Sequence, residues 1–499
     1  MDELRPRVLS ELEDDALASA AEAFSRITVD YFAATRTGEG PVSTPLDALE
    51  LARRFDEPLP LEGRPLEAVV ERLRVDVLSD SNRLCHPRSM GHQVSAPLPA
   101  AVWTESLIAA LNQSGAVQEM SPVGTAVENR VVRWMCDLAG LGPEAGGTFT
   151  SGGTEATFTA LLAARAASLP NAWKEGVGAE PPAVLHGEHA HYAVARAVGA
   201  LGLGTDAAIA VPSSDWRMDV TALEATLRRL EEGGRRVMAV VATAGSTATG
   251  SFDDLDAVGR LCEERGLWLH VDGAHGASAL LSSAHRGRLR GIERARSLAW
   301  DPHKMMLMPL SAGVVLVRNE RDLDAAFAQR APYLFHGVEG ERSPDQGKRS
   351  FQCSRRLDAL KVWVALQRYG AGGLGALYDH LCATARTLHA AIGRRAPFEA
   401  LHEPAANILC FRFVGDRSLE PERLDALNLR LRELFNRSGE GWITTTILGG
   451  KRVLRVTVMN PRTTGADVER VLDGLERTGR QLAEDVRREA GQAPGGTRP

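Results

Sequence analysis

The sequence lacks the features that mark membrane, secreted and nucleic-acid-binding proteins. No run of apolar residues approaches the length of about 20 needed to span a bilayer, and the first stretch, MDELRPRVLSELEDD, has no apolar core of the signal-peptide kind. The net charge is -6 and the pI about 6.2, so there is no positive excess to attract nucleic acid. We therefore expect neither a membrane nor a nucleic-acid partner.

Cysteine is scarce and irregularly placed. The six cysteines show no Cys-x-x-Cys spacing, which argues against a zinc ribbon or a disulfide framework. They are Cys85, Cys136, Cys262, Cys353, Cys382 and Cys410. Reduced thiols are typical of the cytoplasm, so we expect a cytoplasmic protein without a metal site.

What is present is the composition of a globular chain. Its 499 residues suffice for two or three domains, and 44% are hydrophobic and 24% charged. We predict a helical segment at residues 1–95, a large domain at 96–375, a smaller α+β domain at 376–485 and a disordered tail at 486–499.

Residues 145–320 alternate short apolar stretches with helical ones. The predicted strands are AVLHG, VMAVVAT, LWLHVD, SLAW and GVVLVRN. The helix DDLDAVGRLCEERG can begin at Asp253 or Asp254 and end at Gly266, and the earlier helix SPVGTAVENRVVRWMCDLAGLG ends at Gly140. This alternation predicts an α/β fold with a mostly parallel sheet covered by helices. The later stretches NILCFRFVG and RVLRVTVMNP alternate as antiparallel strands do.

Polar side chains gather where the predicted strands end, and ligands of an open parallel sheet bind beyond those ends. LWLHVD ends in Asp272, a carboxylate that needs a positive partner or hydrogen bonds at such depth. SLAW leads into Asp301, His303 and Lys304. The other strand ends carry His186, His189, His191, Thr243, Ser246 and Thr247.

A glycine-rich turn, Ser151 to Thr154, leads straight into an apolar helix, and such a helix start suits phosphate. Each feature has a plainer explanation by itself. Such turns are common, Asp272 could be a cap, the histidines could bind zinc, and Lys304 could be a surface lysine. Together, a phosphate cradle, a buried carboxylate, an imidazole and a lysine describe one ligand, pyridoxal phosphate (PLP). The lysine forms a Schiff base, and the carboxylate keeps the pyridine nitrogen protonated so that the ring acts as an electron sink.

From about residue 45 to 485 the chain resembles the group II PLP-dependent amino acid decarboxylases. This family includes glutamate, cysteine sulfinate, aspartate, aromatic amino acid, histidine and diaminobutyrate decarboxylases. The matching segments are HPRSMGHQVSAPLP, ALNQ, SP with the later Glu128, TSGGTEAT, GEHAHYAVARA, SFDDL, HVDGAHG, DPHK and CSRRLDALKVW. The resemblance implies fold type I of the PLP-dependent transferases, with an N-terminal helical segment and a small C-terminal α+β domain.

The resemblance also implies a role for individual residues. Lys304 binds PLP covalently, Asp272 pairs with the ring nitrogen, and His191 stacks on the ring. The other cofactor residues that it implies are Gly153, Thr154, Thr247, Ala274 and His303. His186 and His189 are then structural, and Asp253 a cap.

Tyr333 lies in the polar, glycine-rich stretch RAPYLFHGVEGERSPDQGKRS. In the family, a tyrosine on a mobile loop donates the proton that replaces the lost CO2, and Tyr333 resembles that tyrosine. The plainer interpretation is an aromatic that anchors a loop. With the resemblance, we predict α-decarboxylation that depends on Lys304, Tyr333, His191 and Asp272.

The substrate side of the site has three candidates. Arg455 resembles the arginine with which glutamate-type members bind a substrate carboxylate, although a surface arginine at a sheet edge is an equal alternative. His92 and Gln93 would face the substrate side chain, where aromatic-specific members carry large aromatics. We expect a polar or acidic substrate, such as glutamate, aspartate or 2,4-diaminobutyrate. An aromatic one such as tyrosine, tryptophan or DOPA is the alternative.

The resemblance further implies a homodimer with shared active sites, into which SGAVQEMSP (residues 114–122) reaches from the neighbour. Two other functions stay open: another fold-type I reaction, such as transamination or carbon–sulfur lyase chemistry, and an inactive PLP-fold scaffold. A nucleotide-binding domain is disfavoured, because TSGGTEAT contains neither G-x-G-x-x-G nor the Walker lysine.

Overall fold

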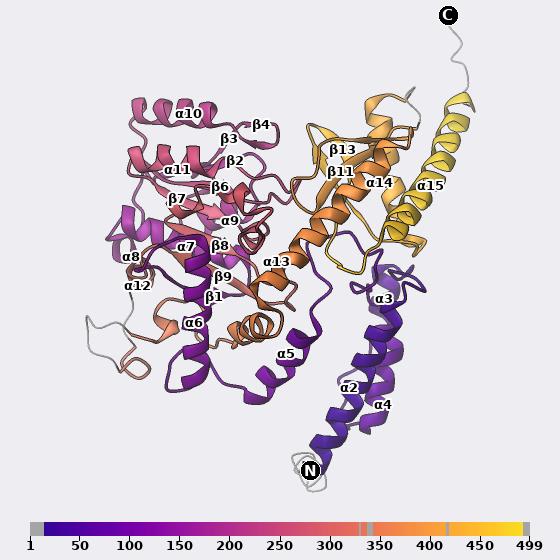
Figure 1. Ribbon diagram of the computed structural model, residues 1–499, viewed down its shortest axis with the longest axis horizontal. Helices are drawn as coiled ribbons and strands as arrows, with labels where there is room; N and C mark the ends of the chain where they lie inside the picture. The colour runs from indigo at the N-terminus through magenta and orange to yellow at the C-terminus, as the bar shows by residue number, and fades with distance from the viewer. Residues whose placement is uncertain (1–13, 329–330, 337–342, 416–418, 493–499) are drawn as a thin grey trace, which may run out of the picture. The chain divides into compact units, whose positions relative to one another are not determined.

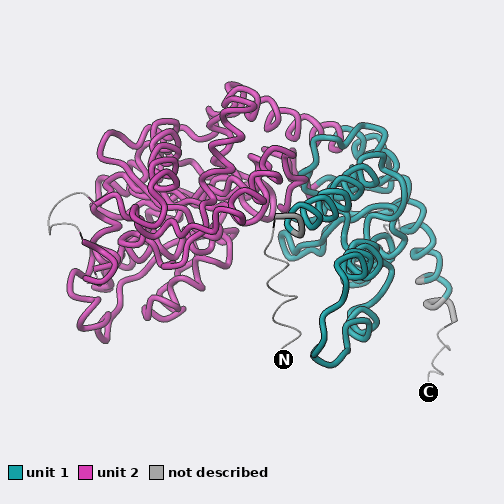
Figure 2. Tube along the Cα trace, turned by 90° about the horizontal axis from the view of Figure 1, so that it is seen from below, with its two compact units in different colours: residues 1–92, 390–400, 411–499 teal, residues 93–389, 401–410 magenta. Residues whose placement is uncertain are grey.

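The computed structural model divides into two compact units (Figure 2). It describes residues 14–328, 331–336, 343–415 and 419–492. The first unit comprises residues 1–92, 390–400 and 411–499, and the second comprises residues 93–389 and 401–410. The N-terminal helices and most of the C-terminal α+β region, which the sequence suggests are separate, thus form one unit.

The second unit is built on a seven-stranded sheet (Figure 1). Its strands are β1 Gly146–Thr150, β2 Ala183–Gly187, β3 Ala208–Val211, β6 Val237–Thr243, β7 Trp268–Asp272, β8 Ser297–Trp300 and β9 Gly313–Val317. Their order in the sheet is β1-β9-β8-β7-β6-β2-β3. β9 pairs antiparallel with both neighbours, and the other pairs are parallel. The predicted α/β fold with a mostly parallel sheet is confirmed.

Helices cover this sheet. The helices of the second unit are α5 Pro99–Leu111, α6 Pro122–Ala139, α7 Gly153–Ser168, α8 Ala172–Glu175, α9 Ala193–Ala200, α10 Val220–Glu232, α11 Leu255–Glu264, α12 Arg321–Ala326 and most of α13 Asp358–Gly393. α7 packs across β6 to β9 with α9 and α12 beside it, and α11 packs against β6 and β7. Side chains of α7, α9 and α12 share one core cluster with Val184, Val241 and Trp268 of the strands. Strands covered in this way can be almost wholly apolar, as their sequences are.

Two predicted helix boundaries have identifiable causes. α6 ends at Gly140, which adopts a φ of 67° that favours glycine. α11 begins after Asp254, whose side chain accepts a hydrogen bond from the Ala257 N–H at 3.0 Å. The neighbouring Asp253 is instead buried, and it accepts the N–H groups of Met218 and Thr243 at 2.7 Å each. Asp253 therefore braces the end of β6, where the sequence predicts a cap.

The first unit combines helices with most of a small antiparallel sheet. Its elements are α2 Asp14–Arg36, α3 Ala48–Arg54, α4 Leu66–Arg72, β10 Phe398–Ala400, the end of β11 Ile408–Phe413, α14 Pro421–Arg437, β12 Thr444–Leu448, β13 Lys451–Thr457 and α15 Gly465–Gln492. The strand order is β10-β11-β13-β12. Helix α15 includes residues 486–492 of the tail expected to be disordered, and residues 493–499 lie outside the described part of the chain.

Three further findings bear on function. Within the described ranges, no helix has both the length and the apolar character that crossing a membrane requires. Over those same residues, no group of three or more His, Cys, Asp or Glu side chains is placed to hold a metal ion. None of the six cysteines, all of which lie in the described ranges, forms a disulfide.

Candidate cofactor site

The polar residues at the strand ends line one cavity of about 330 Å³ in the second unit. β1, β6, β7 and β8 all end there, as expected for ligand binding at the carboxyl edge of a parallel sheet. The lining residues are Ser151, Gly152, Gly153, Thr154, His191, Thr243, Gly245, Thr247, Asp272, Ala274, His275, Asp301, His303, Lys304 and Leu310. All eight residues predicted to contact the cofactor are among them.

The glycine-rich turn forms one wall of this cavity, between the end of β1 and the start of α7. A Cβ added at Gly153 would lie 2.8 Å from the Ala274 Cβ, so the turn packs too closely to its neighbours for a side chain there. Ser151 donates both its N–H and its hydroxyl to Glu155 Oε2, at 2.8 and 2.7 Å. The turn is thus held at the positive end of α7, where an anion such as phosphate is stabilised.

Lys304 lies beside this turn and is held by Asp301. Its Nζ is 3.1 Å from Asp301 Oδ2, and the same oxygen accepts the Gly153 N–H at 3.0 Å. The Asp301 side chain is only 2% exposed. One buried carboxylate therefore ties Lys304 to the Ser151–Thr154 turn.

Two of the three cavity histidines, His191 and His303, are arranged as uncharged rings. Burial lowers the pKa of His191, and the positive charge of Lys304 lowers it further against the opposing effect of Asp272. Burial also lowers the pKa of His303. Each Nδ1 accepts a backbone N–H, from Ala193 at 3.2 Å and from Ala312 at 3.1 Å, so each neutral ring carries its proton on Nε2. An uncharged, flat imidazole suits stacking on an aromatic ring.

The residues of the cavity fit PLP. Thr243 Oγ1 and Asp301 Oδ1 are buried without a hydrogen-bond partner among the described residues, and buried polar atoms in that state call for a ligand or water. The volume lies in the range of small-molecule sites. A phosphate turn, a carboxylate at Asp272 for the ring nitrogen and an amine at Lys304 for the aldehyde are the groups that this cofactor requires.

Four predicted residues do not line the cavity. The Tyr333 ring is 83% exposed, and residues 337–342 that follow it are outside the described part. His92 and Arg455 lie in the first unit, where the His92 ring packs edge-on 5.0 Å from Trp442. Burial lowers the pKa of His92, and the charges of Arg455 and Arg432 lower it further. Gln93 is the first residue of the second unit.

Seven lining residues are not among the eight named cofactor contacts, although Ser151 and Gly152 belong to the turn that the sequence predicts to bind phosphate. The seven are Ser151, Gly152, Thr243, Gly245, His275, Asp301 and Leu310. Adjacency is the signal that could have found most of them, since Asp301 precedes Lys304 by three residues and His275 follows Asp272 by three. Leu310 carries no such signal, because the backbone after Lys304 decides where it lies.

Comparison with known proteins gives consistent matches. A family profile described as "Pyridoxal-dependent decarboxylase conserved domain" matches residues 50–414. The chain is 37% identical over 431 residues to L-2,4-diaminobutyrate decarboxylase of Rhizobium meliloti (strain 1021), covering 85% of the chain and 84% of that protein. It is 33% identical over 445 residues to cysteine sulfinic acid decarboxylase of Rattus norvegicus, covering 87% and 90%. The crystal structure of mouse CSAD matches with a TM-score of 0.88 at 30% identity, over 94% of this chain and 99% of that one.

Proposed function

Because the chain belongs to the family of pyridoxal-dependent decarboxylases, we propose that it decarboxylates L-2,4-diaminobutyrate to CO2 and a primary amine, 1,3-diaminopropane. The reaction class is that of a PLP-dependent carboxy-lyase acting on a polar or acidic amino acid. The observation that carries the proposal is the single cavity lined by all eight predicted cofactor residues. The substrate is supported by the diaminobutyrate decarboxylase that shares 37% identity with the chain.

The chain's own residues have distinct tasks in this proposal. Bound PLP supplies a ring that takes up the electron pair left when CO2 departs. We propose that Lys304 holds the cofactor, that Asp272 stands at the ring nitrogen and that neutral His191 stacks on the ring. Asp301 orients the Lys304 amine through its 3.1 Å contact, and the Ser151–Thr154 turn holds the phosphate.

An acidic amino acid is the second candidate substrate. Arg455 and Arg432 both act on the pKa of His92, so cationic side chains surround this predicted substrate residue within the first unit. Such a setting favours a side-chain carboxylate or sulfinate over the ammonium group of diaminobutyrate. Cysteine sulfinic acid decarboxylase, at 33% identity, is a relative whose name fits this alternative.

A substrate panel separates the two candidates. With PLP supplied, we expect kcat/KM for L-2,4-diaminobutyrate to exceed that for glutamate, aspartate and cysteine sulfinate by at least about tenfold, measured as CO2 release and amine mass. If kcat/KM is instead higher for an acidic amino acid, and Arg455→Gln abolishes that preference, the substrate is acidic. A keto acid without CO2 would instead indicate transamination, and aromatic amines would indicate the aromatic alternative.

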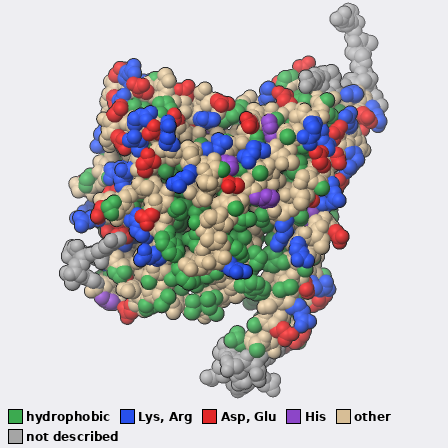
Figure 3. Space-filling model, in the orientation of Figure 1, with side chains coloured by type: hydrophobic (Ala, Val, Ile, Leu, Met, Phe, Trp, Pro, Cys, Tyr) green, Lys and Arg blue, Asp and Glu red, His purple; other side chains and the backbone are tan. Residues whose placement is uncertain are grey.

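We further propose a homodimer, supported by an exposed apolar stripe on α5. One side of this helix is buried and carries Ala101, Thr104 and Ile108. On the other side Trp103, Leu107 and Leu111 follow one another at four-residue intervals and are 41%, 51% and 43% exposed. Figure 3 shows hydrophobic side chains gathered on this face of the molecule, in the region of α5. A second copy of the chain that covers them would remove this patch from water.

The N-terminal helices give the homodimer separate support. Neither α3 nor α4 contains a buried residue, although Leu49 and Val69 are large apolar side chains on them. Helices of seven residues are not stable in isolation and need tertiary packing. Packing against a second subunit would supply it.

Leu107→Glu is expected to weaken the dimer by at least about 30-fold, because it places an unpaired charge in the apolar interface. Analytical ultracentrifugation over a concentration series measures this change. Leu429→Glu is the matched control, since Leu429 is an exposed leucine of α14, away from α5 in the sequence, and should leave assembly unchanged. A Leu107→Glu protein that remains a dimer at the wild-type dissociation constant would reject the α5 interface.

We also propose a cytoplasmic location, supported by the state of the cysteines. Burial raises the pKa of Cys85 to about 11 and those of Cys136, Cys262 and Cys382 to about 12. These side chains therefore stay protonated and behave as small apolar groups of the core. Free thiols of this kind are usual in a reducing compartment.

A further inference from the structure

The strand that leads into the phosphate turn lies at the edge of the sheet. β1 pairs with β9 on one side, and an edge strand leaves backbone N–H and C=O groups on its other side without strand partners. At Phe149, two side chains take those groups. The Phe149 N–H donates to Glu128 Oε1 at 3.0 Å, and Arg355 Nη2 donates to the Phe149 carbonyl at 3.1 Å. The two side chains thus occupy the place of a neighbouring strand.

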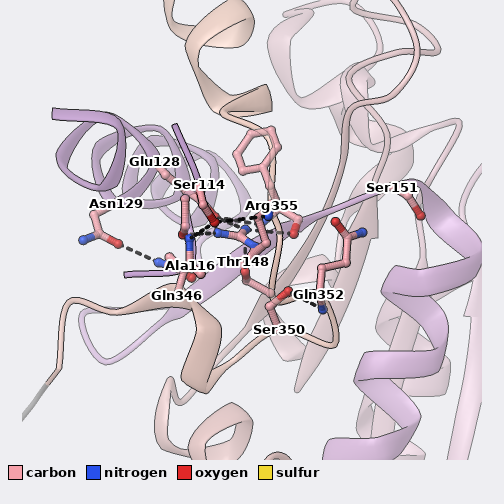
Figure 4. A network of polar contacts seen from close by, with 12 residues as sticks. Ser114, Ala116, Glu128, Asn129, Thr148, Ser151, Gln346, Ser350, Gln352 and Arg355 are labelled. Carbon is pink, nitrogen blue, oxygen red and sulfur yellow. Dashed lines mark hydrogen bonds and ion pairs between the residues drawn. The ribbon is translucent and has the colours of Figure 1, made fainter. Parts of the chain in front are cut away.

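Glu128 and Arg355 also form an ion pair of 2.6 Å, and both side chains are only 2% exposed. Figure 4 shows the hydrogen bonds that the guanidinium of Arg355 donates to several acceptors. Nη2 donates to Thr148 Oγ1 at 3.0 Å, and Nη1 donates to the Gly115 carbonyl at 2.7 Å. The planar fork of arginine can serve these acceptors at once, whereas the point charge of lysine cannot.

Gln352, three residues before Arg355, holds the other side of the turn. Its Nε2 donates to Glu155 Oε2 at 2.5 Å, and the same oxygen accepts both donors of Ser151. The segment from Gln352 to Arg355 therefore contacts β1 just before the turn and α7 just after it begins. None of Glu128, Gln352 and Arg355 lines the cavity.

We propose that the buried Glu128–Arg355 pair is a positioning element for the phosphate group of the cofactor. It replaces the missing strand at the edge of β1 and so fixes the Ser151–Thr154 turn relative to Lys304 and Asp272. This inference rests on the proposed cofactor site. It implies that loss of the pair weakens binding of phosphate-bearing PLP more than binding of pyridoxal, which has the same ring and aldehyde and no phosphate.

The test compares dissociation constants for PLP and pyridoxal in full-length apoprotein, from titrations of the visible absorbance. Arg355→Met removes the ion pair. Arg355→Lys loses the planar guanidinium but keeps the positive charge beside Glu128, and we therefore expect this second variant to disturb folding less than the first. We expect the ratio of the PLP to the pyridoxal dissociation constant to rise about tenfold in both. Arg412→Met is the control, because Arg412 is a buried arginine paired with Asp425 in the first unit and does not contact β1. It should lower the melting temperature and leave the ratio at the wild-type value.

Each outcome decides the inference. If Arg355→Met does not fold, Arg355→Lys alone decides. An unchanged ratio in Arg355→Lys, or equal weakening of both ligands, overturns the positioning role and leaves Arg355 as a general stabilising residue. A wild-type protein that binds neither ligand would contradict the proposed cofactor site itself, which is a separate failure.

Discussion

Lys304→Ala is expected to lose both amine production and the yellow absorbance of lysine-bound cofactor. Alanine has no amine to join the PLP aldehyde, and among the described residues no second lysine lines the cavity. Turnover should fall by at least about 10⁴-fold, in keeping with the loss of a covalently acting residue. The visible spectrum after addition of PLP measures the first loss, and mass spectrometry of borohydride-reduced protein locates the attached lysine.

Lys361→Met is the matched control for this experiment. Lys361 is fully buried, as its 0% exposure shows, but its Nζ lies 3.1 Å from Asp358 and donates to the Ser311 carbonyl at 2.6 Å. Its loss should lower the melting temperature and keep the yellow absorbance. If Lys304→Ala retained borohydride-trapped cofactor on a single other lysine, the assignment of Lys304 would be wrong.

Much of the fold is predictable because the signals are local. AVLHG, VMAVVAT and SLAW coincide with β2, β6 and β8, since apolar runs bounded by polar or glycine residues suit strands buried on both faces. The caps at Gly140 and Asp254 act within a few residues of the helices that they bound. The cavity follows from the same reasoning, because parallel strands bring their carboxyl ends to one edge.

Other features depend on contacts that no local pattern specifies. GGTFT is not among the predicted strands, yet it forms β1, and the side chains of Glu128 and Arg355 bond the backbone of its Phe149. The role of Asp301 depends on where Gly153, nearly 150 residues earlier, meets it. The grouping of the N-terminal helices with the C-terminal sheet likewise rests on long-range packing. Such contacts are set by tertiary structure, which sequence periodicity does not encode.

Tyr333→Phe is expected to keep the yellow absorbance and to lose amine production by about 10²- to 10⁴-fold, the usual contribution of a general acid. The phenol O–H would protonate the carbon that has lost CO2, and phenylalanine keeps the ring but has no proton to give. Single-turnover CO2 release and amine formation, followed separately, measure the effect. Tyr192→Phe is the control within the chain, since the Tyr192 ring lies 4.1 Å from that of His191 at the cavity. If Tyr333→Phe keeps full amine production and Tyr192→Phe loses it, the proton donor is Tyr192 and not Tyr333.

The exposure of Tyr333 makes a further experiment decisive. Its ring is 83% exposed and does not line the cavity of its own chain, so we propose that it serves the cavity of the partner subunit. Inactive Lys304→Ala and Tyr333→Phe proteins are mixed and allowed to exchange subunits. If the tyrosine acts across the dimer, each mixed dimer has one cavity with both Lys304 and the partner's Tyr333, and random pairing restores about a quarter of wild-type activity. If the tyrosine acts within its own chain, every cavity lacks one of the two groups and no activity returns.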